Sequence, residues 1–90
     1  MNLTTRLETL RTSAIDRLAA AGDVAAVERL RSDLLGRTGE LTILLKDLGT
    51  IPSEDRPSVG RLANEVRGAL EAAIDTRLAA MRETALEARL

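Results

Sequence analysis

The sequence predicts an all-α protein in which long amphipathic helices fold back on one another as an antiparallel hairpin. Among its 90 residues there is no Phe, Tyr or Trp, so the core must come from Leu, Ile, Val, Met and many Ala. Such a core is narrow and allows close helix packing. The only two prolines, Pro52 and Pro57, lie in one short segment. The rest of the chain is rich in Ala, Leu, Arg and Glu, which are the strongest helix formers.

A first helix is expected over residues 3–20. Asn2 is a candidate N-cap for it, and Gly22 can end it as a left-handed residue before Asp23 caps the next helix. A connection this short implies a sharp reversal or a kink between the two helices. The apolar stripe of the first helix, at the three- and four-residue spacing of one helical face, consists of Leu3, Leu7, Leu10, Ala14 and Leu18.

The second helix is expected over residues 24–48, with a kink at Gly36 and Gly39. Leu34 and Leu41 lie on either side of these glycines and are seven residues apart, or about two helical turns. The apolar stripe therefore keeps its phase, as in one helix that is bent rather than ended. Its members are Val24, Val27, Leu30, Leu34, Leu41, Leu44, Leu45 and Leu48.

A turn is expected over residues 49–53, where Gly, Thr, Pro and Ser cluster, and a long helix over residues 54–90. Pro57 is tolerated in this helix because it falls in the first turn. The seven intervals of its apolar stripe span 26 residues, and the mean spacing of about 3.7 is wider than the 3.5 of a left-handed coiled coil. The stripe consists of Val59, Leu62, Val66, Leu70, Ile74, Leu78, Met81 and Ala85.

The wide spacing predicts a nearly straight hairpin, or a seam that drifts around the long helix. The limb formed by residues 24–48 would pair with the near half of the long helix. The shorter N-terminal helix, residues 3–20, would pack at the base of the hairpin, against the far half. The expected architecture is a coiled-coil arm with a two-helix tip on a three-helix base, forming a single domain over residues 1–90.

The residue types that carry most enzyme and metal chemistry are absent. The chain has no His and no Cys, which removes the commonest general base, the commonest metal ligand and the thiolate nucleophile. Carboxylates lie beside Arg at helical spacing, as expected of a solvated charged face. The segment from Gly36 to Gly39 lacks the Lys-Ser/Thr of a phosphate-binding loop. We therefore expect no catalytic site, no metal site and no cofactor within these 90 residues.

Charge and hydropathy narrow the choice of partners. The formal net charge is −1, from 13 basic and 14 acidic residues, which is unlike the strong basic excess of most nucleic-acid-binding domains. All the basic residues except Lys46 are Arg, which reflects either an Arg-rich codon usage or selection for bidentate phosphate contacts. The chain has no secretory leader pattern and no apolar run of ~20 residues. We expect a cytoplasmic protein without a membrane partner.

Two segments are more specific than composition. The first, residues 34–42, reads Leu-Leu-Gly-Arg-Thr-Gly-Glu-Leu-Thr, and the second, residues 51–60, reads Ile-Pro-Ser-Glu-Asp-Arg-Pro-Ser-Val-Gly. In this order and at this separation they resemble the N-terminal domain of the bacterial phenylalanyl-tRNA synthetase alpha subunit, and the resemblance covers essentially the whole chain. Where that family often has two Lys, this sequence has Arg37 and Thr38, which leaves one positive charge instead of two.

The resemblance implies a tRNA-binding arm that is not an enzyme by itself. In that family the arm is an antiparallel helical coiled coil, which projects from a tetramer of two alpha and two beta subunits and helps to hold tRNA(Phe). The class II catalytic core, with its ATP, Mg²⁺ and phenylalanine sites, lies further along the alpha chain. Leu90 falls inside a helical pattern, so the chain is expected to be a piece of a longer alpha chain.

The resemblance also implies which residues contact tRNA, each as a phosphate anchor that positions the RNA without reading its sequence. These candidates are Arg37, Lys46, Arg56, Arg61 and Arg67. The alternative for each is a surface ion pair, for instance between Arg61 and Glu65. The residues expected to be structural, setting the kink and the start of the long helix, are Gly36, Gly39, Pro57 and Gly60.

A competing hypothesis is a structural or oligomerisation coiled coil that makes no contact with RNA. The isolated arm could also self-associate, because apolar faces normally covered in a larger assembly would be exposed.

Overall fold

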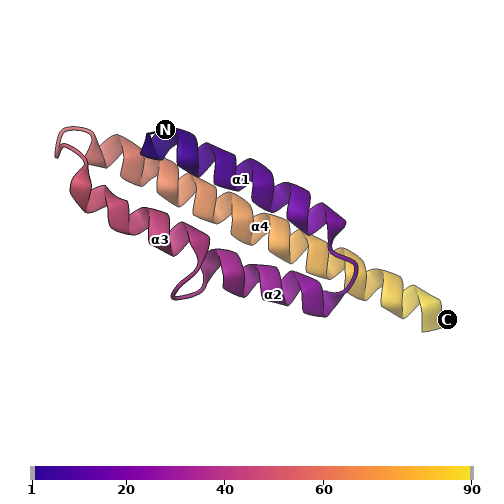
Figure 1. The fold of residues 1–90 in the computed structure, drawn as a ribbon. Helices are drawn as coiled ribbons and strands as arrows, with labels where there is room; N and C mark the ends of the chain where they lie inside the picture. The colour runs from indigo at the N-terminus through magenta and orange to yellow at the C-terminus, as the bar shows by residue number, and fades with distance from the viewer. Residues whose placement is uncertain (1, 90) are drawn as a thin grey trace.

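The computed structural model describes residues 2–89, and for residues 84–89 it describes the backbone only. The helices within this range are α1 (Leu3–Ala20), α2 (Val24–Leu35), α3 (Glu40–Lys46), the short 3₁₀-helix η1 (Asp47–Thr50) and α4 (Arg56–Arg89). No strand occurs among the described residues, so the predicted all-α class is confirmed. α2 and α3 run antiparallel to α4, and α1 packs alongside them in a rod with extents of 56 × 19 × 19 Å (Figure 1).

Side-chain caps begin the first two helices, as their sequences predict. Asn2 caps α1, because its side-chain oxygen accepts a hydrogen bond from the Thr5 N–H at 2.8 Å. Asp23 caps α2 in the same way and accepts from the Ala26 N–H at 2.7 Å. Each cap satisfies a backbone donor that has no partner inside its helix.

The connection between α1 and α2 turns without a left-handed residue. The predicted left-handed role of Gly22 is wrong, because no glycine among the described residues has a positive φ. α1 ends instead at Ala21, whose backbone is extended with φ −64° and ψ 130°. The Ala21 carbonyl accepts a hydrogen bond from Nη2 of Arg77 at 2.9 Å, so the long helix α4 helps to end the first one.

Residues 36–39, here called the elbow, separate α2 from α3. The prediction of one kinked helix over residues 24–48 is therefore wrong. At Gly36 the backbone leaves the helical conformation, with ψ of 175°. Leu34 and Leu41 are nevertheless both buried. The apolar stripe keeps its phase across the elbow because it reflects burial of side chains, which a short turn can preserve while it interrupts the backbone ladder.

Residues 47–55, here called the tip, reverse the chain into the long helix. They form η1 and then an irregular turn, so the reversal is longer than the predicted 49–53 and α4 begins at Arg56 rather than at residue 54. α4 then runs to Arg89 and extends beyond the ends of α1 and α2 that lie away from the tip (Figure 1). Leu90, the predicted end of this helix, lies outside the described residues.

α1 packs against the helical hairpin, as predicted. It extends closer to the tip, however, than the predicted position at the base of the hairpin. Its first turns lie beside the tip, where Nη1 of Arg6 is 2.8 Å from the carboxylate of Asp47. Leu7 and Leu10 share one core cluster with Leu44 of α3. The two-helix tip is therefore wrong, since α1 covers both limbs there. The apolar stripe of α1 predicts which face of this helix is buried, but it does not predict which part of the hairpin that face contacts.

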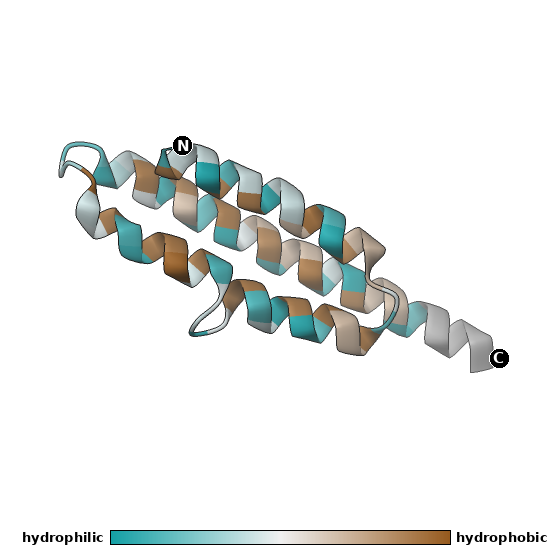
Figure 2. Ribbon diagram, viewed as in Figure 1, coloured by the Kyte–Doolittle hydropathy of each residue, from teal (hydrophilic) through white to brown (hydrophobic). Residues whose placement is uncertain are grey.

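Two apolar clusters form the core, and the hydrophobic residues that build them recur along each helix (Figure 2). The predicted stripe of α1 is buried at every position. Along α4 the predicted stripe is buried or half-buried from Val59 to Met81, and the Ala85 side chain lies outside the described set. The buried residues nearer the tip are Leu3, Leu7, Leu10, Ala14, Leu34, Leu41, Leu44, Ala63, Val66 and Leu70. Those of the second cluster are Leu18, Ala21, Val27, Ile74 and Leu78.

Candidate nucleic-acid interface

Several arginines are held by carboxylates of neighbouring helices. These contacts join α1 to the tip, α1 to α3 and α2 to α4, with N–O distances of 2.8 Å, 2.9 Å and 3.0 Å. Their side chains are between 37% and 73% exposed, so each pair contributes at most about 1 kcal/mol to stability. Their charges are already balanced within the chain. The pairs are Arg6–Asp47, Arg17–Glu40 and Arg31–Asp75.

Arg67 lies in a groove between α2 and α4 in which acidic residues predominate. Its Nε is 3.4 Å from the carboxylate of Glu71, one helical turn further on. The groove is also lined by Glu28, Arg31 and Asp75, so carboxylates outnumber cations. A phosphate would meet net repulsion there, which makes Arg67 the least favourable of the five candidate contacts.

Arg56, the first residue of α4, donates hydrogen bonds to the backbone of the tip. Its Nε donates to the Ile51 carbonyl at 3.2 Å, and its Nη2 donates to the Gly49 carbonyl at 3.1 Å. Two of the five N–H groups of the guanidinium are thus used by the protein itself. The sequence does not predict this contact, because no local pattern distinguishes an arginine that binds the chain's own carbonyls from one that binds phosphate.

Lys46 and Arg61 flank the tip on its two limbs. Lys46 is the last residue of α3, Arg61 lies in the second turn of α4, and both are exposed. Among the described side chains, neither forms an ion pair with a carboxylate, and the pair considered between Arg61 and Glu65 is not seen there. Both charges are therefore available to an anion.

Arg37 is exposed at the elbow, at the opposite end of α3 from Lys46. The seven residues of α3 separate the two by about 10 Å of helix. Within the described part of the chain Arg37 has no ion-pair partner either. The fold thus gathers three of the candidate residues around the tip and leaves two outside it. The three are Lys46, Arg56 and Arg61.

Gly36 and Gly39 occupy positions where the backbone folds closely on itself. A Cβ added to Gly39 would lie 2.7 Å from both the carbonyl carbon and the oxygen of Leu34, and one added to Gly36 would collide with the Ser32 carbonyl. The Gly36 carbonyl accepts hydrogen bonds from the Gly39 N–H at 2.9 Å and from the Thr42 hydroxyl at 2.7 Å. These close contacts explain why both positions of the elbow are glycine, since a larger residue would clash with the backbone.

The other two residues expected to be structural differ from each other. Pro57 falls in the first turn of α4, where its missing N–H has no intrahelical acceptor and costs little. At Gly60, however, an added Cβ would meet nothing within 4 Å. No close contact at the start of α4 therefore accounts for the glycine at this position.

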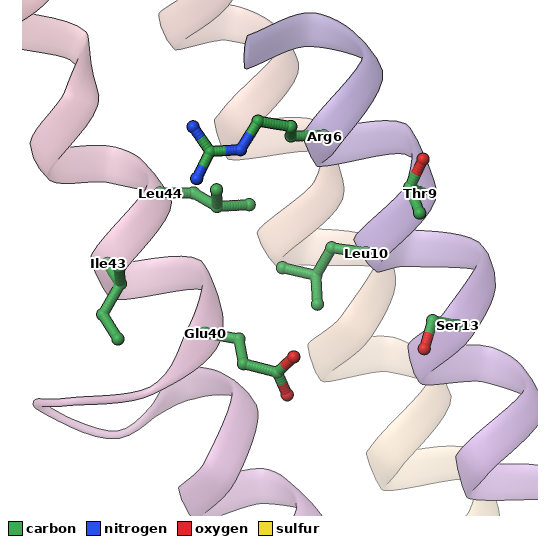
Figure 3. Close-up of a pocket in the computed structure, with 7 residues that line it drawn as sticks. All are labelled: Arg6, Thr9, Leu10, Ser13, Glu40, Ile43 and Leu44. Atoms are coloured by element: carbon green, nitrogen blue, oxygen red, sulfur yellow. The ribbon is translucent and has the colours of Figure 1, made fainter. Parts of the chain in front are cut away.

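The groove between α1 and α3 has an apolar floor and a volume of about 350 Å³. Leu10 and Leu44 point toward each other across it from the two helices (Figure 3). The charged residues at its rim, Arg6 and Glu40, are already engaged in ion pairs. Since none of the lining residues is a His, a Cys or an unpaired carboxylate, the groove presents no general base. It therefore has the character of a packing surface.

Among the side chains that the structure describes, those of residues 2–83, no group of three or more His, Cys, Asp or Glu is placed to hold a metal ion. No helix within residues 2–89 combines the length and apolar character needed to cross a bilayer.

Comparison with known families places this helical rod in a class. Residues 22–90 match the family described as aminoacyl tRNA synthetase class II, N-terminal domain. α1 lies before the matched range, although it packs against the core of the hairpin. The matched residues comprise both limbs, the elbow and the tip, which are the parts of the molecule that carry all five candidate contacts.

Individual relatives narrow the class further, and each is named as a phenylalanine–tRNA ligase alpha subunit. The protein from Nitrosospira multiformis is 43% identical over 86 residues, which cover 96% of this chain and 25% of the relative. That from Pseudomonas putida is 39% identical over 84 residues, or 93% of this chain and 25% of the relative. That from Synechocystis sp. is 36% identical over all 90 residues and 27% of its own length.

The chain therefore belongs to the family of phenylalanine–tRNA ligase alpha subunits. It spans about a quarter of the length of the curated relatives that it matches.

Proposed function

We propose that this chain is the tRNA-binding arm of a phenylalanine–tRNA ligase and helps to position tRNA(Phe) for aminoacylation. The catalytic core, with ATP, Mg²⁺ and phenylalanine, belongs to sequence outside these 90 residues. The other partner is a beta subunit, in a cytoplasmic tetramer of two alpha and two beta chains. Family membership supports this role, and the observation that carries it is the pair of cations, Lys46 and Arg61, that flanks the exposed tip without ion-pair partners among the described side chains.

The chemistry of these cations suits contacts that position RNA. A phosphate bound by Lys46 or Arg61 would gain a charged partner without breaking an ion pair of the protein. Such contacts fix the register of an RNA backbone but do not read its bases. With a net charge of −1, the chain has no general attraction for polyanions. Binding must therefore depend on where the few available cations lie.

Salt titration of tRNA binding to this chain tests the proposal. Three phosphate contacts, at Lys46, Arg61 and Arg37, predict a log–log slope of affinity against salt of about −2 to −3. Fluorescence anisotropy with labelled tRNA(Phe), at ionic strengths on the order of 0.02 to 0.2 M, measures the slope. Absence of binding at the lowest salt, with tRNA that an intact ligase charges, would contradict the proposal.

A second candidate function is a structural or oligomerisation module without RNA contact. Its support is the exposure of three large apolar side chains, Ile15 at 46%, Val24 at 38% and Ile43 at 51%, because such residues are common where chains associate. Sedimentation equilibrium distinguishes the candidates. A stable dimer that binds no tRNA favours the second, and a monomer that binds with the predicted salt slope favours the first.

A further inference from the structure

The carbonyl groups at the tip lack the backbone donors that a continuing helix would supply. η1 ends at Thr50, and the next donor in its three-residue ladder for the Gly49 carbonyl would come from Pro52. Proline has no N–H, so this ladder stops and leaves the Gly49 carbonyl open. No backbone hydrogen bond found at the described turns reaches Gly49 or Ile51 as an acceptor.

Arg56 fills both vacancies from across the turn. Its Nε and Nη2 donate to the Ile51 and Gly49 carbonyls at 3.2 Å and 3.1 Å. The two donors lie on one rigid planar group, so they fix the two carbonyls relative to each other. The first residue of α4 is thereby tied to the last residues of the opposite limb, five and seven positions earlier in the chain.

Other side chains tie the preceding part of the tip. The Thr50 hydroxyl donates to the Asp47 carbonyl at 2.7 Å, and the Asp47 carboxylate is paired with Arg6 of α1. These contacts hold η1, whereas only Arg56 joins η1 and the turn to α4 through side-chain hydrogen bonds in the described structure. Leu48 and Ile51 also pack against the core, but Arg56 is the side chain that holds the Gly49 and Ile51 carbonyls in place relative to α4.

We propose that Arg56 is a positioning residue: it sets the shape of the tip, and through it the spacing of Lys46 and Arg61, without being a phosphate ligand itself. The effect of Arg56 on tRNA binding rests on the proposed RNA-binding function. Its effect on the order of the tip applies to the free protein as well. A phosphate ligand contributes a positive charge that displaces counterions from the RNA, so its removal lowers the salt slope. A positioning residue of this kind needs the planar fork of arginine, which the single ammonium of lysine does not reproduce.

The substitutions Arg56→Lys and Arg56→Ala separate these two roles. Amide hydrogen exchange in the free chain, followed by NMR, reports on the order of the tip without RNA. We expect both variants to raise exchange at the amides of residues 49–51 and 53–55 about tenfold, as loss of two hydrogen bonds would. Circular dichroism should show unchanged helicity, since Arg56 contacts only the tip. Arg6→Ala is the matched control, because it removes another arginine contact of the tip but leaves both carbonyls satisfied.

Measurements of tRNA affinity and of its salt slope then test whether the shape of the tip affects tRNA binding. Both Arg56 variants should weaken binding, with Arg56→Lys close to Arg56→Ala, and neither should change the salt slope. Lys46→Ala should lower the slope by about 1, the signature of a lost phosphate contact. If Arg56→Lys keeps wild-type exchange and affinity while Arg56→Ala loses affinity and about one unit of slope, then Arg56 is a phosphate ligand and the proposal is overturned.

The two levels of the proposal fail separately. If the wild-type chain binds no tRNA, the RNA-binding function fails, but the exchange experiment still decides whether Arg56 orders the tip. If exchange at the amides of residues 49–51 and 53–55 is unchanged in both Arg56 variants, the positioning role is wrong whatever the affinity for tRNA.

Discussion

The elbow and the tip both reverse or interrupt the same limb, yet they are held in different ways. At the elbow the backbone packs on itself, with Gly39 against the Leu34 carbonyl and the Thr42 hydroxyl on the Gly36 carbonyl. At the tip the backbone is open, since a Cβ added to Gly49 would meet nothing within 4 Å, and side chains such as that of Arg56 supply the missing hydrogen bonds.

The difference shows which turn can vary and which cannot. The elbow excludes any side chain at its glycines, and Gly39 is buried, so its role is to keep two helices in phase on the core. The tip is exposed at most of its positions and has open space at Gly49, and Arg56 supplies the hydrogen bonds that join its carbonyls to α4. An exposed turn with available cations on both limbs is suited to contact a partner, whereas an elbow whose glycines leave no room for a side chain is suited to support the fold.

The largest effect is expected for Gly39→Ala compared with Gly49→Ala. The new methyl at Gly39 would press on the Leu34 backbone, which cannot move like a flexible side chain, so we expect a loss of about 2–3 kcal/mol in the free energy of unfolding. At Gly49 the methyl has open space and reduces the freedom of the unfolded chain, so stability should stay the same or rise by less than about 1 kcal/mol. Urea denaturation measures both, and equal losses would contradict the contrast.

A smaller effect is expected for Thr42→Val compared with Thr50→Val. The Thr42 hydroxyl is partly buried and donates to the Gly36 carbonyl at 2.7 Å, so its removal should cost about 1 kcal/mol. The Thr50 hydrogen bond is exposed and water can replace it, so the loss should be a few tenths of a kcal/mol, within the range about 0–0.5 kcal/mol of ordinary surface changes. Thermal unfolding followed by circular dichroism makes the comparison, which fails if the order is reversed.

The smallest effect is expected for Arg6→Ala, which breaks the contact between α1 and the tip. The ion pair with Asp47 has side chains 42% and 40% exposed, so its loss should lower the free energy of unfolding by less than about 1 kcal/mol. The loss should shrink further at high salt, because exposed charges are screened. A deficit above 2 kcal/mol, about twice that bound, would mean that this contact does more than the geometry indicates.

The periodicity of the sequence predicts most of the fold, because it reports which face of each helix is buried. It predicts the buried stripes of α1 and α4, while the cluster of Gly, Thr, Pro and Ser around Pro52 predicts the turn. It does not predict the break at the elbow, since Leu34 and Leu41 remain in phase although the backbone ladder between them is interrupted. Nor does it place α1 along the hairpin, because a leucine stripe does not specify which apolar surface covers it.

The candidate site is predictable to a lesser degree. The motifs locate the basic residues near the tip and the elbow, but the charge environment of each residue depends on neighbours distant in the sequence. The groove around Arg67 is acidic because Glu28 of α2 lines it together with Glu71 and Asp75 of α4. The hydrogen bonds from Arg56 require a turn whose carbonyls face α4. No local pattern contains either feature.

Reversal of charge at the tip tests the central proposal most directly. The double variant Lys46→Glu, Arg61→Glu is compared with Arg11→Glu, Arg29→Glu, which makes the same change in net charge on α1 and α2. With tRNA(Phe) at low salt, we expect the tip variant to lose affinity at least about tenfold and the salt slope to fall by about 2, while the control changes little. Equal losses in both variants, or none in the tip variant, would contradict a tRNA contact at the tip.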